Sequence, residues 1–134
     1  EELQDLIRDL HMEDRVLLKG VLNNAIKENR YATAFVMSSD FEGFPNTLVE
    51  AMANGIPSIS TDFSTRAAKQ LLKDGDCGWL VDAGNEEQLA AAMINIIENP
   101  AMAQEKASKG LYVREYLATD AVCQQWIDEI ERTL

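Results

Sequence analysis

The apolar positions along the chain follow two patterns. Short continuous apolar runs are typical of buried strands, and apolar residues three or four positions apart are typical of helices with one buried face. Strands are therefore predicted at residues 15–20, 31–37, 57–61 and 77–81. Helices are predicted at residues 1–10, 23–30, 47–53, 65–72, 86–97, 99–115 and 120–134.

The later helices carry more specific signals. Asn85 with Gln88 three residues later resembles a capping box, and Asn99 followed by Pro100 is typical of a helix start. Because strands alternate with helices and each strand is a continuous apolar run, the sequence predicts an α/β fold with a doubly wound parallel sheet. The last helix should place one apolar stripe against the core, formed by Val122, Trp126, Ile127, Ile130 and Leu134.

The composition agrees with one domain over residues 1–134, whose C-terminal helices run from about residue 100 to 134. Hydrophobic residues make up 46% of the chain, enough for a core. The formal net charge is −11. Such a charge argues against nucleic acid or an anionic membrane surface as a partner, because both attract basic proteins.

The cysteines, the segments that could target or anchor the chain, and its first residue lead to expectations about its location and its length. Cys77 and Cys123 are too few for a disulfide scaffold and should be buried free thiols. Neither a signal peptide nor an apolar run of membrane-spanning length is recognised, so a cytoplasmic protein without a transmembrane segment is expected. The chain begins at Glu1, inside a predicted helix, so we expect it to be a piece of a longer protein, truncated on its N-terminal side.

Residues 38–57 contain most of the candidate chemistry. This stretch follows a predicted strand, makes a turn at residues 42–45 and continues into a short helix that Asn54 and Gly55 should end. A strand, a turn and a helix N-terminus in that order are a natural place to bind an anion. Gly43 strengthens this prediction, since it has no Cβ to obstruct a ligand.

The start of this helix and two glutamates complete the candidate site. Glu42 in the turn and Glu50, expected in the first turn of the helix, only accept hydrogen bonds when ionised and therefore suit hydroxyl groups. Taken singly, they could be a turn residue and a helix-dipole residue. Together they favour a nucleotide-sugar site, with Glu50 on the ribose and Glu42 on the sugar. With Asn46 as the N-cap, the unpaired N–H groups that suit the phosphates are those of Thr47, Leu48 and Val49.

The phrase from Glu42 to Pro57, with its E-x7-E pair, resembles the signature of family 4 glycosyltransferases. Residues 16–21, 35–39 and 74–81 resemble further segments of that family, so the resemblance covers most of the chain. It implies the GT-B fold of two Rossmann-like domains, of which this chain would be the C-terminal, donor-binding half. It also implies a hexose transfer that retains the anomeric configuration.

The resemblance implies roles for individual residues. The position of Glu42 is catalytic and contacts the donor's hexose near the reacting carbon, and Glu50 matches the carboxylate that binds the ribose. The amides at Thr47 and Leu48 bind the diphosphate. Neither a metal nor another cofactor is expected. The full set of implied donor-binding residues is Gly43, Phe44, Pro45, Asn46, Thr47, Leu48, Glu50 and, at the nucleotide base, Val21.

The implied partners are a nucleoside diphosphate sugar and a saccharide or lipid-linked acceptor. The family binds the acceptor with an N-terminal domain and neutralises the diphosphate with an Arg and a Lys, all of which would precede Glu1. Their absence accounts for the acidic balance of this chain, which is expected to be inactive alone. Its parent is expected in the cytoplasm, where it could lie at the inner face of the membrane. Residues 63–70 depart from the family pattern of glycines and a Pro–Glu pair.

Other interpretations stay open for the same residues. Residues 74–76, Asp-Gly-Asp, have the form of a metal-binding motif, but these residue types are ordinary in turns. Trp79 and Trp126 could stack on sugars, although their apolar surroundings favour core positions. Glu42 and Glu50 could be the acid–base pair of a glycosidase, whose substrate has no phosphate. A sugar-nucleotide epimerase of the same fold and a non-catalytic nucleotide-binding or interaction module are the remaining alternatives.

Overall fold

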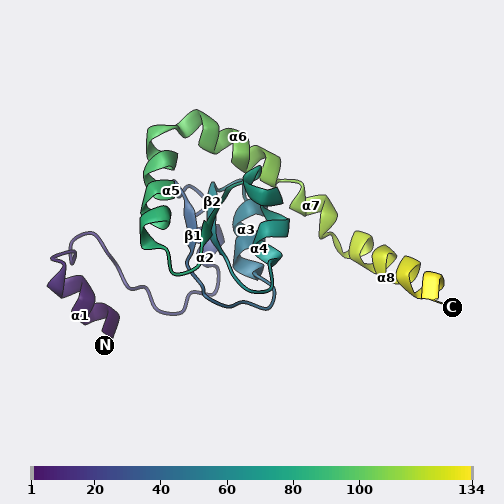
Figure 1. Ribbon diagram of the computed structural model, residues 1–134, viewed down its shortest axis with the longest axis horizontal. Helices are drawn as coiled ribbons and strands as arrows, with labels where there is room; N and C mark the ends of the chain where they lie inside the picture. The colour runs from purple at the N-terminus through teal and green to yellow at the C-terminus, as the bar shows by residue number, and fades with distance from the viewer. Residues whose placement is uncertain (1, 134) are drawn as a thin grey trace.

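The computed structural model describes residues 2–133 of the chain. Three strands form its centre, and helices surround them (Figure 1). The strands are β1 (Phe35–Met37), β2 (Ser58–Asp62) and β3 (Trp79–Asp82). The helices are α1 (Glu2–Asp9), α2 (Ala25–Glu28), α3 (Asn46–Ala53), α4 (Ala67–Leu71), the short 3-10 helix η1 (Lys73–Gly75), α5 (Glu86–Glu98), α6 (Pro100–Gly110), α7 (Val113–Tyr116) and α8 (Thr119–Thr133).

The sheet is parallel, with the order β1-β2-β3. On one face, Leu48 and Met52 of α3 pack with α4 and with Val113 of α7. On the other, Ala92 and Ile96 of α5 pack against Ile59 of β2. Helices therefore cover both faces, and the predicted α/β fold with a parallel sheet is confirmed. Three of the four predicted strands are present, although β1 is shorter than the predicted run 31–37.

The centre of the sheet is built from small residues that allow close packing. β2 carries Ser58 and Ser60, both fully buried, and their hydroxyls donate to nearby backbone carbonyls. Gly78 lies just before β3, and a Cβ placed there would come within 2.5 Å of the Ser58 carbonyl oxygen and 2.7 Å of a Leu72 methyl carbon. A side chain at position 78 would therefore clash with the backbone of the neighbouring strand.

Of the capping box predicted for the fifth helix, one of the two hydrogen bonds is confirmed. The Asn85 side chain accepts a 3.0 Å hydrogen bond from the backbone N–H of Gln88, which pairs one of the donors left over at the start of α5. The Gln88 side chain turns back to Asp82 instead of to the Asn85 backbone, bonding both the N–H and the carboxylate of Asp82. The start of α5 is thus fastened to the end of β3.

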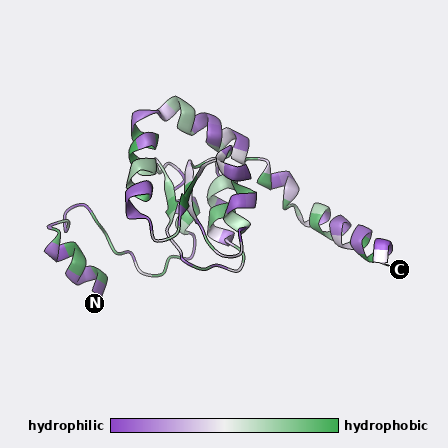
Figure 2. Cartoon of the chain, in the orientation of Figure 1, coloured by the Kyte–Doolittle hydropathy of each residue, from purple (hydrophilic) through white to green (hydrophobic). Residues whose placement is uncertain are grey.

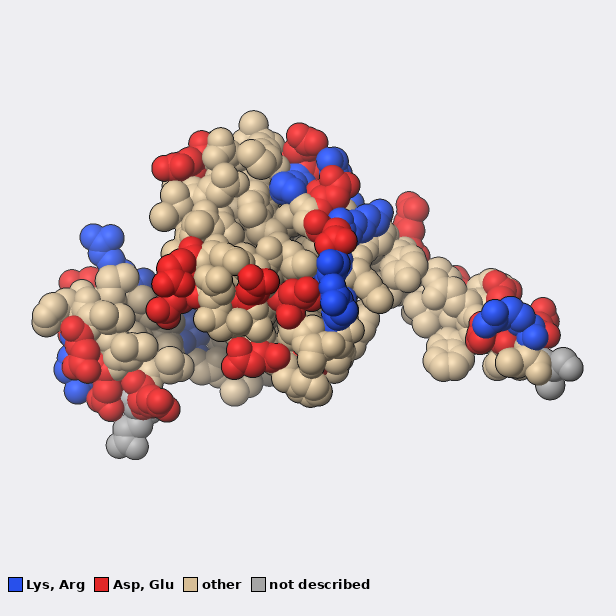
Figure 3. Space-filling model, in the orientation of Figure 1, with Lys and Arg blue, Asp and Glu red and all other residues tan. Residues whose placement is uncertain are grey.

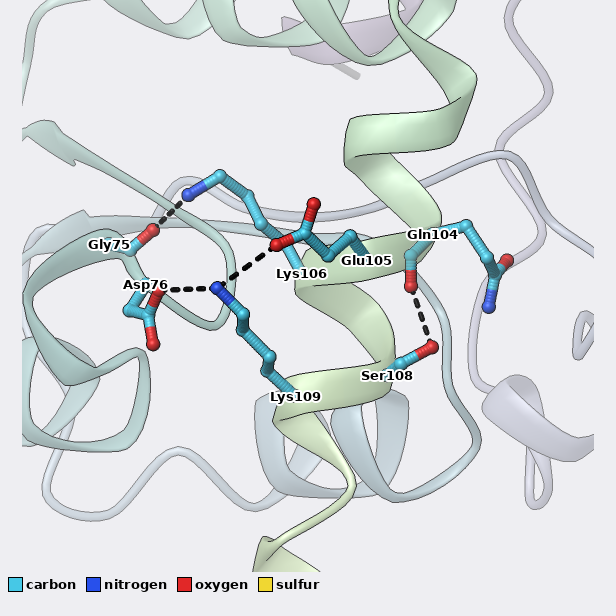
Figure 4. Close-up of polar contacts among 7 residues, drawn as sticks. All are labelled: Gly75, Asp76, Gln104, Glu105, Lys106, Ser108 and Lys109. Atoms are coloured by element: carbon cyan, nitrogen blue, oxygen red, sulfur yellow. Dashed lines mark hydrogen bonds and ion pairs between the residues drawn. The ribbon is translucent and has the colours of Figure 1, made fainter.

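Helix α6 is fastened to the turn before β3 by two lysines (Figure 4). Lys106 Nζ donates to the Gly75 carbonyl, and Lys109 Nζ lies 2.9 Å from Asp76 Oδ1. The hydrogen bond from Lys109 lowers the pKa of the Asp76 carboxyl. Asp74 forms its own 2.9 Å ion pair with Lys69. Both carboxylates of residues 74–76 thus pair with lysines, as expected of a structural turn.

The predicted strand at residues 15–20 is wrong. Residues 16–22 form neither helix nor strand, and Leu17 keeps 69% of its surface exposed. The segment leads from α1 toward the core without joining the sheet (Figure 1). The physical reason is that, within residues 2–133, β2 pairs with β1 and β3 and no strand pairs with this run. An apolar run without a neighbouring strand cannot pair its backbone groups as a sheet would.

The inner face predicted for the last helix is also wrong. Helix α8 projects away from the core (Figure 1), and its apolar positions alternate with polar ones along the exposed arm (Figure 2). Trp126 is 67% exposed, and Ile127 and Ile130 are exposed as well. Val122 is half-buried, and Leu134 lies outside the described residues. Cys123 on the same helix is exposed, contrary to expectation, whereas Cys77 is buried as predicted.

The remaining differences are smaller. The predicted helix at residues 99–115 ends at Gly110 and resumes as α7. Met93 and Ile97 of α5 are exposed, so that only a narrow face of this helix is buried. Trp79 is half-buried, and its Nε1 donates to Asn95. Among the described residues, no helix combines the length and the apolar character needed to cross a membrane.

Candidate functional site

The motif loop leaves the carboxyl end of β1 and leads directly into α3. Residues 38–45 form this loop, and β2 and β3 end at the same edge of the sheet because all three strands are parallel. In open α/β sheets, ligands bind outside the carboxyl ends of the strands. The fold therefore places the predicted motif where such sheets bind ligands.

The start of α3 differs by one residue from the prediction. Pro45, not Asn46, is the N-cap, and no side chain caps the helix. Proline suits the helix start because it has no N–H group to leave unpaired. The Val49 N–H bonds the Pro45 carbonyl at 3.2 Å, and the Asn46 N–H bonds the Phe44 carbonyl at 3.0 Å.

The change of cap narrows the set of free donors. Of the predicted donors Thr47, Leu48 and Val49, only the N–H groups of Thr47 and Leu48 have no backbone partner within residues 2–133. Two adjacent amides at the start of an eight-residue helix can bind one anionic group. The correction leaves the two amides for which the family resemblance implies diphosphate binding.

Glu42 is half-buried and held by hydroxyl groups. Ser39 Oγ donates a 2.9 Å hydrogen bond to Glu42 Oε1, and Thr65 Oγ1 donates a 3.1 Å bond to the Glu42 backbone carbonyl. Thr61 Oγ1 at the end of β2 donates to the Ser39 carbonyl. The prediction assigned no role to these three hydroxyls. Only the S-x-x-E spacing of Ser39 and Glu42 was visible in the sequence, whereas both threonines lie more than 20 positions from their partners.

Glu50 lies in the second turn of α3, not in the first as predicted, because the helix begins at Asn46. Its side chain is exposed, and Thr47, three residues earlier, is exposed on the same face of the helix. The Glu50 carboxylate has no hydrogen bond or ion pair to any residue from 2 to 133. One face of α3 thus carries a free amide at Thr47 and a free carboxylate at Glu50.

The other predicted site residues divide into two groups. Gly43 and Phe44 are exposed in the loop, Pro45 is buried under it, and a Cβ at Gly43 would meet no atom within 4 Å. Gly43 therefore leaves open space beside Glu42. Val21, the residue expected at the nucleotide base, is 97% exposed in the segment that pairs with no strand. The structure does not bring Val21 to the motif.

A cavity of about 510 Å³ lies beside the motif loop and shares Phe44 with it. Tyr112 closes one side, donating its hydroxyl to the Leu71 carbonyl at 2.9 Å, and burial raises the pKa of this tyrosine. This cavity was not predicted, because its walls come from elements far apart in the sequence. Its lining residues are Phe44, Ala67, Gln70, Leu71, Lys73, Tyr112, Tyr116 and Leu117.

The charges near the motif are mostly negative. Acidic side chains spread over the lower part of the core, while Lys and Arg gather along its right-hand edge (Figure 3). Arg66 follows Thr65 directly, and its guanidinium lies 3.8 Å from Asp62 Oδ2. Asp62 Oδ1 is buried and has no hydrogen-bond partner among residues 2–133. Among residues 2–133, no group of three or more His, Cys, Asp or Glu side chains is arranged to hold a metal ion.

Comparison with other proteins gives the family. Residues 1–111 match the family described as glycosyl transferases group 1. The chain is 27% identical over 126 residues to the poly(glycerol-phosphate) alpha-glucosyltransferase of Bacillus subtilis. The match covers 94% of this chain and 19% of that enzyme. It is 34% identical over 99 residues to the N-acetylgalactosamine-N,N'-diacetylbacillosaminyl-diphospho-undecaprenol 4-alpha-N-acetylgalactosaminyltransferase of Campylobacter jejuni, covering 74% of this chain and 27% of that enzyme.

Solved structures share the fold. The Anabaena protein HepE, solved in complex with UDP-glucose, superposes with a TM-score of 0.86 at 25% identity, over 99% of this chain and 36% of HepE. S. aureus TarM superposes with a TM-score of 0.85 at 23% identity, over 95% of this chain and 26% of TarM. These neighbours are GT-B enzymes, so the predicted Rossmann-like half of a GT-B fold is confirmed. The chain spans only about a fifth to a third of the length of these proteins. It belongs to the glycosyl transferases group 1 family.

Proposed function

We propose that this chain, over residues 1–134, is the donor-binding domain of a family 4 glycosyltransferase. The parent transfers a hexose from a nucleoside diphosphate sugar to a saccharide or lipid-linked acceptor and retains the anomeric configuration. One observation carries the proposal: the loop and the first two turns of α3 combine two unpaired amides, at Thr47 and Leu48, with the carboxylates of Glu42 and Glu50. Phosphate oxygens suit the amides, and hydroxyl groups suit the carboxylates.

Each group has one task in this proposal. The amides of Thr47 and Leu48 bind the diphosphate and stabilise the negative charge that develops on it as the sugar leaves. Glu50 accepts hydrogen bonds from the ribose hydroxyls. Glu42 accepts one from the hexose near the reacting carbon. Departure of the diphosphate and attack of the acceptor on the same face of the sugar give retention. The mechanism requires neither a metal nor another cofactor.

The relatives support the choice of donor and acceptor. HepE was solved with UDP-glucose, so a UDP-sugar is the first donor to test. The relatives' names include a poly(glycerol-phosphate) chain and a diphospho-undecaprenol lipid, which favour a polymeric or lipid-linked acceptor. We propose that a further domain of the parent binds this acceptor. An undecaprenol-type acceptor would place the parent at the inner face of the membrane, within the cytoplasm.

Titration calorimetry of the chain with UDP-glucose and with UDP tests the donor site. Glu50→Gln should lower the affinity for both ligands by about tenfold, because a charge-assisted hydrogen bond to the ribose that they share is lost. Glu42→Gln should weaken UDP-glucose but not UDP. Glu87→Gln, an equal change at an exposed position of α5, serves as the control.

Two results would overturn the proposal. One is the absence of binding to UDP-, GDP- and ADP-sugars alike. The other is hydrolysis of simple glycosides without any nucleotide, which would instead make Glu42 and Glu50 a glycosidase pair. If UDP and UDP-glucose bind the Glu42→Gln variant as they bind the wild type, Glu42 has no contact with the sugar.

A further inference from the structure

Three hydroxyl groups from three parts of the chain support Glu42, two by direct hydrogen bonds and the third through Ser39. Ser39 comes from the loop after β1, Thr61 from the end of β2 and Thr65 from the loop before α4. Ser39 bonds the Glu42 carboxylate at 2.9 Å, and Thr65 bonds its backbone carbonyl at 3.1 Å. Side chain and main chain of Glu42 are therefore held by different hydroxyls.

The sheet anchors this arrangement. Thr61 is 3% exposed, and its hydroxyl donates to the Ser39 carbonyl rather than to a group within β2. The loop that carries Ser39 is thus bonded to the central strand, which packs between helices on both faces. A group supported in this way keeps its orientation better than one on a free loop.

The contact from Ser39 also decides which part of the carboxylate remains available. An ionised carboxylate accepts through two oxygens, and Ser39 occupies Oε1. Glu42 Oε2 forms no hydrogen bond with any residue from 2 to 133. At the next residue, Gly43, a Cβ would meet no described atom within 4 Å. A ligand hydroxyl would therefore meet one oxygen of Glu42 in a fixed orientation.

We propose that Ser39, Thr61 and Thr65 are positioning residues that hold Glu42 ready for one hydroxyl of the donor's sugar. This inference rests on the proposed function and assigns the preference for a sugar nucleotide over the bare nucleotide to these hydroxyls. None of the three hydroxyls needs to contact the donor itself.

The measured quantity is the ratio of the dissociation constants for UDP and UDP-glucose, obtained by calorimetry. Ser39→Ala should lower this ratio by about tenfold, and Thr65→Val should lower it about threefold, while the affinity for UDP stays unchanged in both. Thr65→Ser keeps the hydroxyl and should restore the wild-type ratio. Ser64→Ala, at the exposed neighbouring position, is the matched control. A role in general stability alone would weaken UDP and UDP-glucose equally and would leave the ratio unchanged.

A measurement without ligand tests the same support and does not depend on how the variants fold. In the wild type, three-bond couplings to the methyl carbon of Thr65 should report one χ1 rotamer, because its hydroxyl is bonded to Glu42. Thr33, exposed and without a side-chain hydrogen bond to residues 2–133, should show averaged couplings. Averaged couplings at Thr65 would overturn the inference.

The outcomes separate the two proposals. If the wild type prefers UDP-glucose and the Ser39→Ala and Thr65→Val variants keep that preference, the positioning role is wrong and the proposed function stands. If the wild type shows no preference for UDP-glucose, the role of Glu42 in the proposed function fails, and the positioning role fails with it.

Discussion

Two apolar runs of similar pattern adopt different structures in this molecule: one is a strand of the sheet, and the other lies outside it. Residues 35–37 form β1, which pairs with β2 and buries Met37 to 8% exposure. Residues 16–18 are at least as apolar, yet they lie outside the sheet and remain exposed. The difference lies in their neighbours rather than in their own sequence. A strand forms where an adjacent strand pairs its backbone groups, and within residues 2–133 only residues 35–37 have such a neighbour.

The same lesson holds for the helices. α5 and α8 both show apolar residues at helical spacing, and both are helical. Ile96 of α5 packs against the sheet, whereas Trp126 of α8 faces solvent. The apolar pattern therefore specified the local conformation in both helices, but it did not specify whether another element covers the apolar face.

Truncating one side chain in each run should give the largest difference in the free energy of unfolding. Met37→Ala should lower the free energy of unfolding by about 2–4 kcal/mol, because it leaves a cavity in the cluster with Leu48 and Phe63. Leu17→Ala should change it by less than about 0.5 kcal/mol, since Leu17 is exposed. Urea unfolding followed by circular dichroism measures both. Equal losses would show that residues 16–18 are packed in solution and would erase the contrast between the two runs.

Two glycines, one beside a paired strand and one in the unpaired run, test the same comparison with smaller expected changes in the free energy of unfolding. Gly78→Ala should cost about 1–3 kcal/mol, because the new methyl group meets the Ser58 carbonyl and the Leu72 side chain. Gly20 lies at the end of the unpaired run, and a Cβ there would meet nothing within 4 Å. Its positive φ of 66° would strain an alanine, but the unpacked segment can relax without losing contacts. Gly20→Ala should therefore leave the urea midpoint unchanged, and a large shift would contradict this view.

These cases show how much of the fold was predictable. Local signals sufficed for the three paired strands, for the Asn85 cap and for the end of α3 at Asn54, because each depends on residues a few positions apart. The fate of residues 15–20 and the exposure of α8 could not be predicted, because they depend on which other segments are present.

The candidate site divides in the same way. The positions of Glu42 and Glu50 in a loop and a following helix were predictable from the motif. The exact cap was not, because Pro45 and Asn46 are both good residues for a helix start and differ by one position. The hydroxyl support of Glu42 was hidden as well, since Thr61 reaches Ser39 and Thr65 reaches Glu42 only after β2 pairs with β1.

The smallest expected effect concerns an exposed ion pair that fastens α6 to the core. The hydrogen bond from Lys109 lowers the pKa of Asp76 in the folded chain. A carboxyl group whose pKa is lower in the folded state stabilises the fold above its unfolded pKa of about 4, and this contribution is lost as pH falls through the folded value. The wild type should therefore exceed Asp76→Asn in stability at pH 7, and the difference should shrink as the pH is lowered below about 4.

Asp14, in the turn before the unpaired segment, provides the control for this last comparison. Asp14→Asn removes the same charge, but Asp14 contacts no cation within residues 2–133. The stability difference between Asp14→Asn and the wild type should therefore not change with pH in the way that the Asp76→Asn difference does. Because the Asp76–Lys109 pair is exposed, water and salt screen it, and 0.5 M salt should reduce its effect. If the two variants respond alike to acid and to salt, Lys109 does not stabilise the turn, and α6 is held by the hydrogen bond from Lys106 and by its apolar contacts at Ala103 and Ala107.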